Sequence, residues 1–272
     1  MRIVSTGATI TSEKFLEKKR RARRKKILVG LSAFLLLTIV AVLALRYDKL
    51  RIQEIVVSGN EILDTQNITS AVAETLSGYY FYLIPRDSSL LYAKDNMRES
   101  LFTLYPRLSS LDIELNGLNT LLVNVRERKP YALYCPDSPL DGGDSCYFLD
   151  SSGFIFDQAP NFSRGVYFTY TSTPPLKSRG TTLMPSDEFT SLSQFIEKLK
   201  GLSIVPELLH LNNSERILET REGVTIIWSD EDDVELLFSN LLSFLGTQEA
   251  DFWQKVLELD LRTENKVFYK LR

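Results

Sequence analysis

An uninterrupted apolar run near the N-terminus limits what this chain can become. The 19 residues Ile27–Leu45 carry no charge and are bounded by Lys26 and Arg46. A helix of about 20 apolar residues spans the hydrocarbon core of a bilayer and satisfies its backbone hydrogen bonds internally. We therefore expect a single transmembrane helix over residues 27–45. A signal peptide cleaved after residues 42–44 is the alternative, although its apolar segment usually has about 7–15 residues.

The distribution of charge gives this helix an orientation. Residues 1–26 contain ten of the 32 Lys and Arg residues of the chain but only two of its 35 Asp and Glu residues. Positively charged flanks stay inside, so residues 1–26 form a basic cytoplasmic tail and the later segments lie outside. The chain beyond residue 26 has a formal net charge of −11, which disfavours binding to nucleic acid. We interpret the basic tail as a topology signal, with contact to anionic lipid as the alternative.

The two cysteines, Cys135 and Cys146, enclose a segment rich in Pro, Gly and Asp, as in a turn-forming insertion. The topology places both outside the membrane, where an oxidising compartment permits a disulfide. Closing so short a loop would contribute about 2–3 kcal/mol in the chain-entropy description. We expect this disulfide rather than free thiols. The spacing fits no zinc site, and no His lies nearby in the sequence.

Residues 51–130, after a linker of residues 46–50, have the pattern of a compact β-α-α-β-β unit. A β-branched run predicts the first strand, and Asp64 is expected to cap the first helix. A second helix is expected over residues 88–104. Alternating apolar residues on either side of Asn116-Gly117 predict a hairpin, because Asn-Gly is the strongest short hairpin signal. The predicted buried face of the first helix consists of Ile68, Ala71, Val72, Thr75 and Leu76.

An aromatic run, GYYFYLIP, occupies residues 78–85 just after the first of these helices. Such a dense set of large apolar residues is more often buried than exposed, so we expect it to belong to the core. An exposed run would instead mark an interface or a contact close to the membrane.

Residues 131–272 are predicted to form a strand-rich α+β domain that includes two helices. Ser186 is expected to cap the first helix, and the second is expected over residues 232–245. Leu257, Leu259 and Leu261 alternate with polar residues, which predicts one face of a strand. The buried face of the first helix is predicted to hold Phe189, Leu192, Ile196 and Leu199. The chain is therefore assigned to the α+β class, with one transmembrane helix before its two α+β domains.

Four segments, in this order, resemble the bacterial FtsQ/DivIB cell-division family. IVVSGNEIL (residues 55–63) resembles the opening strand and turn of the family's POTRA domain, and VRERKPYALY (125–134) resembles the strand that leaves it. FLDSSGFIF (148–156) resembles the first hairpin of the family's β domain, and LDLRTENKVFYK (259–270) its closing hairpin. The chain departs from the family at Thr263, where an aromatic residue is common, and in its cysteine-bounded insertion.

The resemblance implies a non-enzymatic scaffold of the bacterial cytoplasmic membrane that acts at the division site. Such a protein has its N-terminus in the cytoplasm and links early to late division proteins. Its β domain binds small coiled-coil proteins of the FtsB/DivIC and FtsL kinds. The resemblance implies no cofactor, no small-molecule substrate and no nucleic acid.

The last predicted strand offers a physical basis for such binding. A C-terminal strand at the edge of a sheet exposes unpaired N–H and C=O groups, to which a partner segment adds as a further strand. The alternative is that the edge is covered and the strand serves only the core. The candidate partner-binding residues are Lys266, Val267, Phe268, Tyr269, Lys270 and Leu271.

Two other classes of function remain as alternatives. The sequence Asp230-Glu231-Asp232 and the single-pass topology resemble type II membrane glycosyltransferases. Acidic residues in a first helical turn are, however, favoured by the helix dipole, with Ser229 or Asp230 as the cap. The only histidine, His210, lies beside apolar residues and is interpreted as structural. A POTRA-bearing transport or secretion factor would carry several such domains or a β-barrel.

Overall fold

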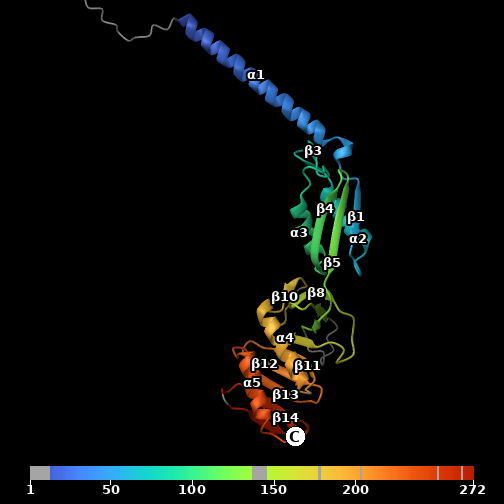
Figure 1. The fold of residues 1–272 in the computed structure, drawn as a ribbon, viewed down its shortest axis with the longest axis vertical. Helices are drawn as coiled ribbons and strands as arrows, with labels where there is room; N and C mark the ends of the chain where they lie inside the picture. Colours follow the sequence, from blue (N-terminus) through green and yellow to red (C-terminus); the bar gives the residue numbers. More distant parts are fainter. Residues whose placement is uncertain (1–12, 137–145, 177–178, 203, 250, 265) are drawn as a thin grey trace, which may run out of the picture. The chain divides into compact units, whose positions relative to one another are not determined.

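The computed structural model describes residues 13–136, 146–176, 179–202, 204–249, 251–264 and 266–272 (Figure 1). The fold is mixed α+β, as predicted, with one long apolar N-terminal helix and a strand-rich part. The chain divides into two compact units. The first comprises Met1–Ser58, Leu63–Arg98 and Asp112–Asn124, and the second comprises Gly59–Ile62, Glu99–Leu111 and Val125–Arg272.

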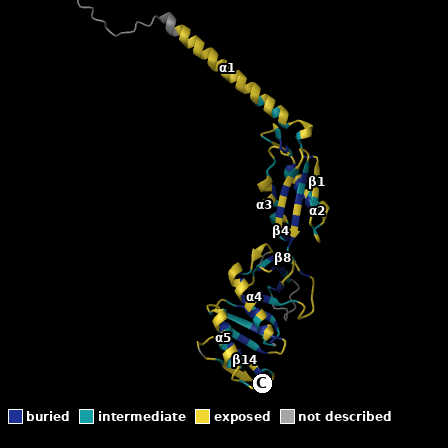
Figure 2. Ribbon diagram, in the orientation of Figure 1, coloured by how far each residue is buried: buried dark blue, intermediate teal, exposed yellow. Residues whose placement is uncertain are grey.

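Helix α1 (Glu13–Leu45) contains the predicted transmembrane segment and begins earlier than expected. The basic tail continues the helix because Lys and Arg are good helix formers. The segment Glu17–Leu45 is long and apolar enough to cross a membrane, and none of its most apolar stretch is buried inside the protein (Figure 2). A short 3-10 helix, η1 (Asp48–Leu50), follows.

A three-stranded sheet has the order β1-β5-β4. Strand β1 (Glu54–Ser58) lies parallel to β5 (Thr120–Glu127), and β4 (Leu108–Asn116) completes the sheet. The turn between β4 and β5 contains Gly117 with φ +72°, a backbone conformation that glycine adopts without strain. The predicted hairpin around Asn116-Gly117 is therefore confirmed.

Helix α2 (Thr65–Leu76) begins as the sequence predicts. The Asp64 side chain accepts a hydrogen bond from the Gln66 N–H at 2.6 Å, which satisfies a backbone donor of the first turn. Thr75 is only partly buried, although it was predicted to lie on the buried face. The buried residues of α2 are Ile68, Ala71, Val72 and Leu76.

Helix α3 (Lys94–Leu104) is shorter than predicted, because Ser88 forms a β-bridge with Arg51 and residues 89–91 form a turn. The N–H and Oγ of Ser89 both donate to the Leu50 carbonyl oxygen, at 2.9 and 3.0 Å. Serine readily makes such side-chain bonds to the backbone, and these compete with helix formation. Long-range bonds therefore replace the first turns of the expected helix.

The expectation that the aromatic run is buried was wrong. Its residues form a small hairpin of β2 (Tyr79–Tyr80) and β3 (Ile84–Pro85). At the tip, Phe81 and Tyr82 are 88% and 94% exposed. A two-strand ribbon with so tight a turn has no second layer behind its tip, so these side chains have nothing to pack against.

A ten-stranded sheet dominates the second unit, in the order β10-β8-β7-β6-β9-β11-β12-β13-β14-β15. Sequence reasoning missed β11 and β12, which pair with each other in antiparallel register. The strands are β6 (Ala132–Tyr134), β7 (Tyr147–Leu149), β8 (Phe154–Gln158), β9 (Thr169–Ser172), β10 (Thr181–Thr182), β11 (Pro206–Leu211), β12 (Glu215–Thr220), β13 (Thr225–Ser229), β14 (Val256–Asp260) and β15 (Phe268–Leu271).

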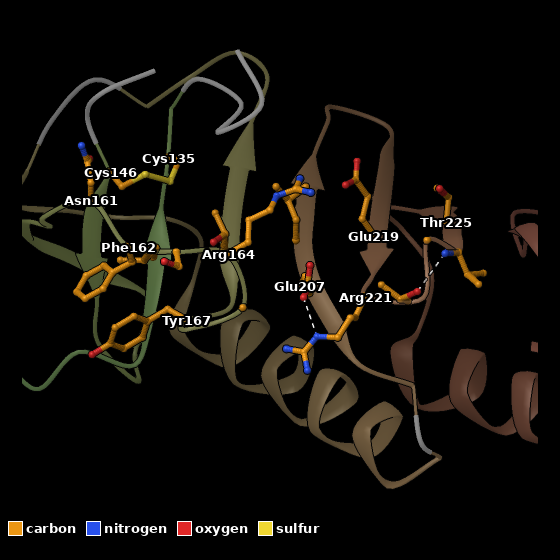
Figure 3. A pocket seen from close by; sticks show the side chains of 18 of the residues that line it. Cys135, Cys146, Asn161, Phe162, Arg164, Tyr167, Glu207, Glu219, Arg221 and Thr225 are labelled. Carbon is orange, nitrogen blue, oxygen red and sulfur yellow. Dashed lines mark hydrogen bonds and ion pairs between the residues drawn. A yellow bond between two sulfur atoms is a disulfide. The ribbon is translucent and has the colours of Figure 1, made fainter. Parts of the chain in front are cut away.

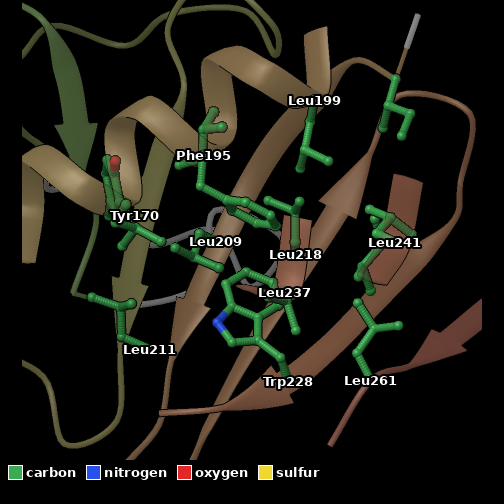
Figure 4. Close-up of a cluster of buried hydrophobic side chains, with 14 of the residues drawn as sticks. Tyr170, Phe195, Leu199, Leu209, Leu211, Leu218, Trp228, Leu237, Leu241 and Leu261 are labelled. Carbon is green, nitrogen blue, oxygen red and sulfur yellow. The ribbon is translucent and has the colours of Figure 1, made fainter. Parts of the chain in front are cut away.

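Helices α4 (Ser186–Gly201) and α5 (Val234–Leu245) and the short α6 (Phe252–Lys255) contribute side chains to the main core, part of which is drawn in Figure 4. The Trp228 ring lies in this core, 5.4 Å from the ring of Phe195 on α4. Helix α4 buries the predicted residues and also Phe195. Its cap position is Pro185 rather than Ser186, which is instead the first helical residue.

Strand β14 departs from the predicted alternation. Val256 and Leu259 are buried, whereas Leu257 is 38% exposed. The pairing with β15 shifts register between Val256 and Glu258. An extra residue in one strand reverses the side-chain alternation at that point, so Leu257 turns away from the core.

Cys135 and Cys146 form a disulfide with an S–S distance of 1.99 Å. Cys135 belongs to a second buried cluster, separate from the main core and made of Leu133, Cys135, Phe148, Phe156 and Ala159. Ala132 and Tyr134 face the main core, so Leu133 between them faces the opposite side of the sheet. Residues 137–145, between the cysteines, lie outside the described part of the chain.

The charged residues of the VRERKP segment have defined partners. Glu127 accepts hydrogen bonds from the N–H groups of Glu61 and Ile62, at 2.8 and 2.9 Å. Arg128 forms an ion pair with Asp150, the first residue of the turn between β7 and β8. The Glu127 bonds hold the loop after β1 at the end of β5, and the Arg128–Asp150 pair joins the segment before β6 to the turn between β7 and β8.

The Asp150–Arg128 pair makes stability depend on pH. Burial acts to raise the pKa of Asp150, but hydrogen bonds from Ser152, the Phe154 N–H and Arg128 outweigh it and lower the pKa below its ordinary value. A carboxylate with a lowered folded-state pKa stabilises the fold above its unfolded pKa, and this contribution is lost as pH falls through the folded value.

We therefore expect the free energy of unfolding to fall as the pH decreases below about 4, the ordinary range of an aspartate. The Asp150→Asn variant should be less stable at neutral pH and should lose less stability on acidification. Urea unfolding of the full chain in detergent at several pH values measures both effects. Glu114→Gln, which alters an exposed carboxylate of β4, is the matched control. Equal acid sensitivity of Asp150→Asn and the wild type would contradict this assignment.

Candidate partner-binding edge

Strand β15 is the last strand of the ten-stranded sheet and pairs with β14 in antiparallel register. Among the described residues, no strand lies on its other side. The strand begins at Phe268, two residues later than the predicted Lys266, whose N–H donates to the Thr263 carbonyl in a turn. Four of the six candidate residues thus lie in the edge strand, and Lys266 and Val267 lie in the turn before it.

The free edge can be assigned to particular backbone groups. The N–H of Arg272 donates to the Lys255 carbonyl oxygen at 2.8 Å, so Arg272 faces the strand that β15 pairs with. Alternate residues of a strand direct their N–H and C=O groups to the same side. Phe268 and Lys270 therefore face β14, whereas Tyr269 and Leu271 direct their N–H and C=O groups to the unpaired edge.

The side chains of β15 divide between two faces. The Tyr269 ring packs 5.5 Å from that of Phe252 and 5.9 Å from that of Phe244, on the helical side of the sheet. Val267 packs against the main core, although it lies in the turn. Phe268 pairs with Asp260 and is 55% exposed on the opposite face. An added strand would therefore meet apolar side chains on both faces of the edge.

Arg262 holds the turn that leads into β15. Its guanidinium group bridges Asp260 on β14 and Glu215 on β12. The hydrogen bonds from Arg262 lower the pKa of Asp260, so the carboxylate stays charged well below neutral pH. Arg262, within the sequence that resembles the closing hairpin, thus has a structural role in positioning the edge strand.

Arg272 fixes the other end of β15 and was not identified from the sequence. Its guanidinium Nε donates to the Val256 carbonyl at 3.3 Å, and a second nitrogen donates to the Glu222 carbonyl. These bonds join the strand end to β14 and to the turn between β12 and β13. No sequence pattern would have identified this role, because its acceptors are backbone carbonyls.

A groove of about 470 Å³ lies between α5 and the turn that precedes β15. Leu236, Phe244 and Val267 contribute apolar surface to it. Four acidic residues, Glu231, Asp232, Asp233 and Glu264, and one basic residue, Lys266, line it. A partner segment that carries apolar side chains next to a basic residue would bind favourably in this groove.

The acidic run before α5 has structural roles. Asp233 is the cap, and its side chain accepts a hydrogen bond from the Glu235 N–H at 2.9 Å, so the predicted caps Ser229 and Asp230 were wrong. Asp232 accepts a bond from the Ser229 N–H at 2.8 Å, and Asp230 forms an ion pair with Arg216. Within the described ranges, no group of three or more His, Cys, Asp or Glu residues is arranged to hold a metal ion.

A second hollow, of about 490 Å³, lies beside the disulfide (Figure 3). The Arg221 guanidinium donates to the Glu207 carboxylate across it at 2.9 Å, so these two charges neutralise each other. His210 does not line this hollow. Its ring nitrogens lie 2.7 Å from the Thr171 hydroxyl oxygen and 3.2 Å from the Thr173 hydroxyl oxygen. Two hydroxyl partners give His210 a structural role.

No protein-family model matches this chain, and no curated protein matches it.

Proposed function

We propose that this protein is a membrane-anchored, non-enzymatic scaffold of the bacterial division site, of the FtsQ/DivIB kind. Helix α1 anchors the chain in the cytoplasmic membrane, with the basic tail inside and residues 46–272 outside. The scaffold links early to late division proteins and binds small coiled-coil partners of the FtsB/DivIC and FtsL kinds.

The unpaired edge of β15 is the observation that carries this proposal. Tyr269 and Leu271 present backbone donors and acceptors there, and an uncovered edge strand is a template for a further strand. Natural sheets usually protect such edges with charges, proline or a covering segment, and β15 carries one charge, on Lys270. Here Phe268, Tyr269 and Leu271 are all at least half exposed, which suits a surface that is covered by a partner.

The order of elements before the edge also supports the proposal. A strand, a helix, a second helix and two strands follow α1 in the order β1, α2, α3, β4 and β5, with the small β2–β3 hairpin inserted. We take these elements as the POTRA-like domain of residues 51–130, and residues 131–272 as the β domain. The sequences at both domain starts resemble those of the division family.

The partner segment has a definable chemistry. It adds to β15 in an extended conformation, so its main chain supplies most of the affinity. Apolar side chains on it contact Phe268 on one face and Tyr269 on the other. A basic residue beside them would meet the acidic side of the groove next to α5.

The test is where the protein resides in dividing cells. An N-terminal fluorescent fusion of the full chain is expected to form a band at the constriction site, and the FtsB/DivIC-like and FtsL-like proteins should co-purify with it. A fusion of residues 1–50 alone is the control and should spread evenly over the membrane. An even distribution of the full chain in every cell, without co-purified division proteins, would contradict the proposed function.

A further inference from the structure

The β2–β3 hairpin in the first unit presents exposed aromatic side chains that the proposed function does not use. Phe81 and Tyr82 form its tip, and Leu83 beside them is 54% exposed. Both tip residues have positive φ, +49° for Phe81 and +61° for Tyr82. Residues other than glycine rarely adopt this backbone conformation, and such strain is often retained at binding surfaces.

The hairpin is tied to the end of the membrane helix. Arg46, the first charged residue after the apolar run, has its guanidinium carbon 6.0 Å from the centre of the Tyr79 ring. Arg51 forms a two-nitrogen ion pair with Asp87, with its Nη2 at 2.7 Å from the carboxylate. Ser89 bonds to the Leu50 carbonyl, as described above. The two ends of the hairpin are therefore held against the residues at which the chain leaves α1.

Further apolar and basic side chains lie on the residues that follow α1 and on those that follow the hairpin. Tyr47 follows Arg46 directly and is 56% exposed, and Leu90 and Leu91 are also exposed. The Arg86 guanidinium lies 5.3 Å from the centre of the Tyr80 ring, at the base of the hairpin. The combination of exposed Tyr, Phe and Leu side chains with nearby arginines is typical of the interface between hydrocarbon and headgroups.

We propose that the tip of this hairpin, Phe81–Leu83, inserts into the outer headgroup region of the bilayer that α1 spans. The inference rests on the membrane anchoring in the proposed function but not on any division partner. The Tyr82 ring is amphipathic and suits the interfacial zone, where its hydroxyl group remains hydrated, and Phe81 and Leu83 add apolar surface. Arg46 and Arg86 then lie at the level of the lipid phosphates, which attract them. The hairpin thus gives the first unit a second point of attachment at the membrane surface.

Tryptophan fluorescence of the full chain in phospholipid vesicles tests the position of the tip. Tyr82→Trp places a reporter there, and the signal of the native Trp228 and Trp253 is subtracted with the wild-type protein. We expect the difference emission to be shifted to shorter wavelength. It should be quenched most strongly by lipids brominated close to the headgroup, and weakly by aqueous iodide.

Two further variants separate the possible failures. Ile62→Trp places a reporter on an exposed residue after the end of β1, outside the β2–β3 hairpin, and it should be quenched by iodide alone. Phe34→Trp reports on the middle of α1 and should be quenched by lipids brominated deep in the chains. Deep quenching of Phe34→Trp together with an iodide-accessible Tyr82→Trp would overturn the hairpin inference and leave the anchor intact. Such a tip would be free for a protein partner. Failure of Phe34→Trp to sense lipid would overturn the anchor as well.

Discussion

Leu271→Pro is expected to weaken capture of a partner strand about tenfold while the second unit stays folded. Proline has no N–H, and the N–H of Leu271 points to the unpaired edge of β15 rather than to β14. The substitution therefore removes an N–H donor that a partner strand would use, and it leaves the hydrogen bonds between β15 and β14 intact. Loss of one hydrogen bond and of close approach costs about 1–1.5 kcal/mol, and about 1.4 kcal/mol corresponds to tenfold in affinity.

Two matched variants define what this result means. Leu271→Ala removes the side chain and keeps the donor, so binding should decrease less than in Leu271→Pro. Lys270→Pro removes a donor that faces β14, so it should loosen the edge strand itself and lower stability. Titration of the full chain in detergent with the coiled-coil partner measures the affinities, and circular dichroism checks the fold. Wild-type affinity in a folded Leu271→Pro protein would exclude strand addition at β15.

Tyr269, another candidate partner-binding residue, is less suitable for this test. Its ring packs on Phe244 and Phe252, so a lysine there would disturb the core as well as the edge. The backbone variants at Leu271 avoid this ambiguity because they leave both rings in place.

Trp228→Ala is expected to have the largest effect on stability. The indole is buried in the main core, and its ring lies 5.4 Å from that of Phe195 on α4 (Figure 4). Truncation of a buried Trp or Phe to alanine costs about 3–5 kcal/mol, because transfer energy is lost and a cavity remains. Such a loss is a large fraction of the stability of an ordinary domain. Trp228 lies on β13, the neighbour of β14, so partner binding at β15 should decrease with it.

Urea unfolding of the full chain in detergent measures this cost. The fluorescence of Trp253 remains as a probe in the variant, since its side chain packs against the same core. Phe81→Ala is the control, because it truncates an aromatic ring that is almost fully exposed and should leave the urea midpoint nearly unchanged. A midpoint for Trp228→Ala equal to that of the control would show that the core tolerates the cavity and would contradict the prediction.

The sequence by itself determined the features that depend on local chemistry. The apolar run of α1 is set by composition, since no soluble surface suits 19 uncharged residues. Asp64 at the start of α2 and the Asn116-Gly117 turn follow from side-chain and backbone preferences within a few residues. The buried face of α2 follows from helical periodicity, because a repeat of 3.6 residues aligns one row of side chains.

Only the tertiary structure decided the features that depend on distant partners. The first turns of the expected second helix gave way to bonds between Ser89 and Leu50, which are far apart in sequence. The bulge in β14 turned Leu257 outward, because register is set by the neighbouring strand. The exposure of Phe81 and Tyr82 and the free edge of Tyr269 and Leu271 have the same cause. A residue's surroundings depend on which segments pack beside it, and no local preference encodes that choice.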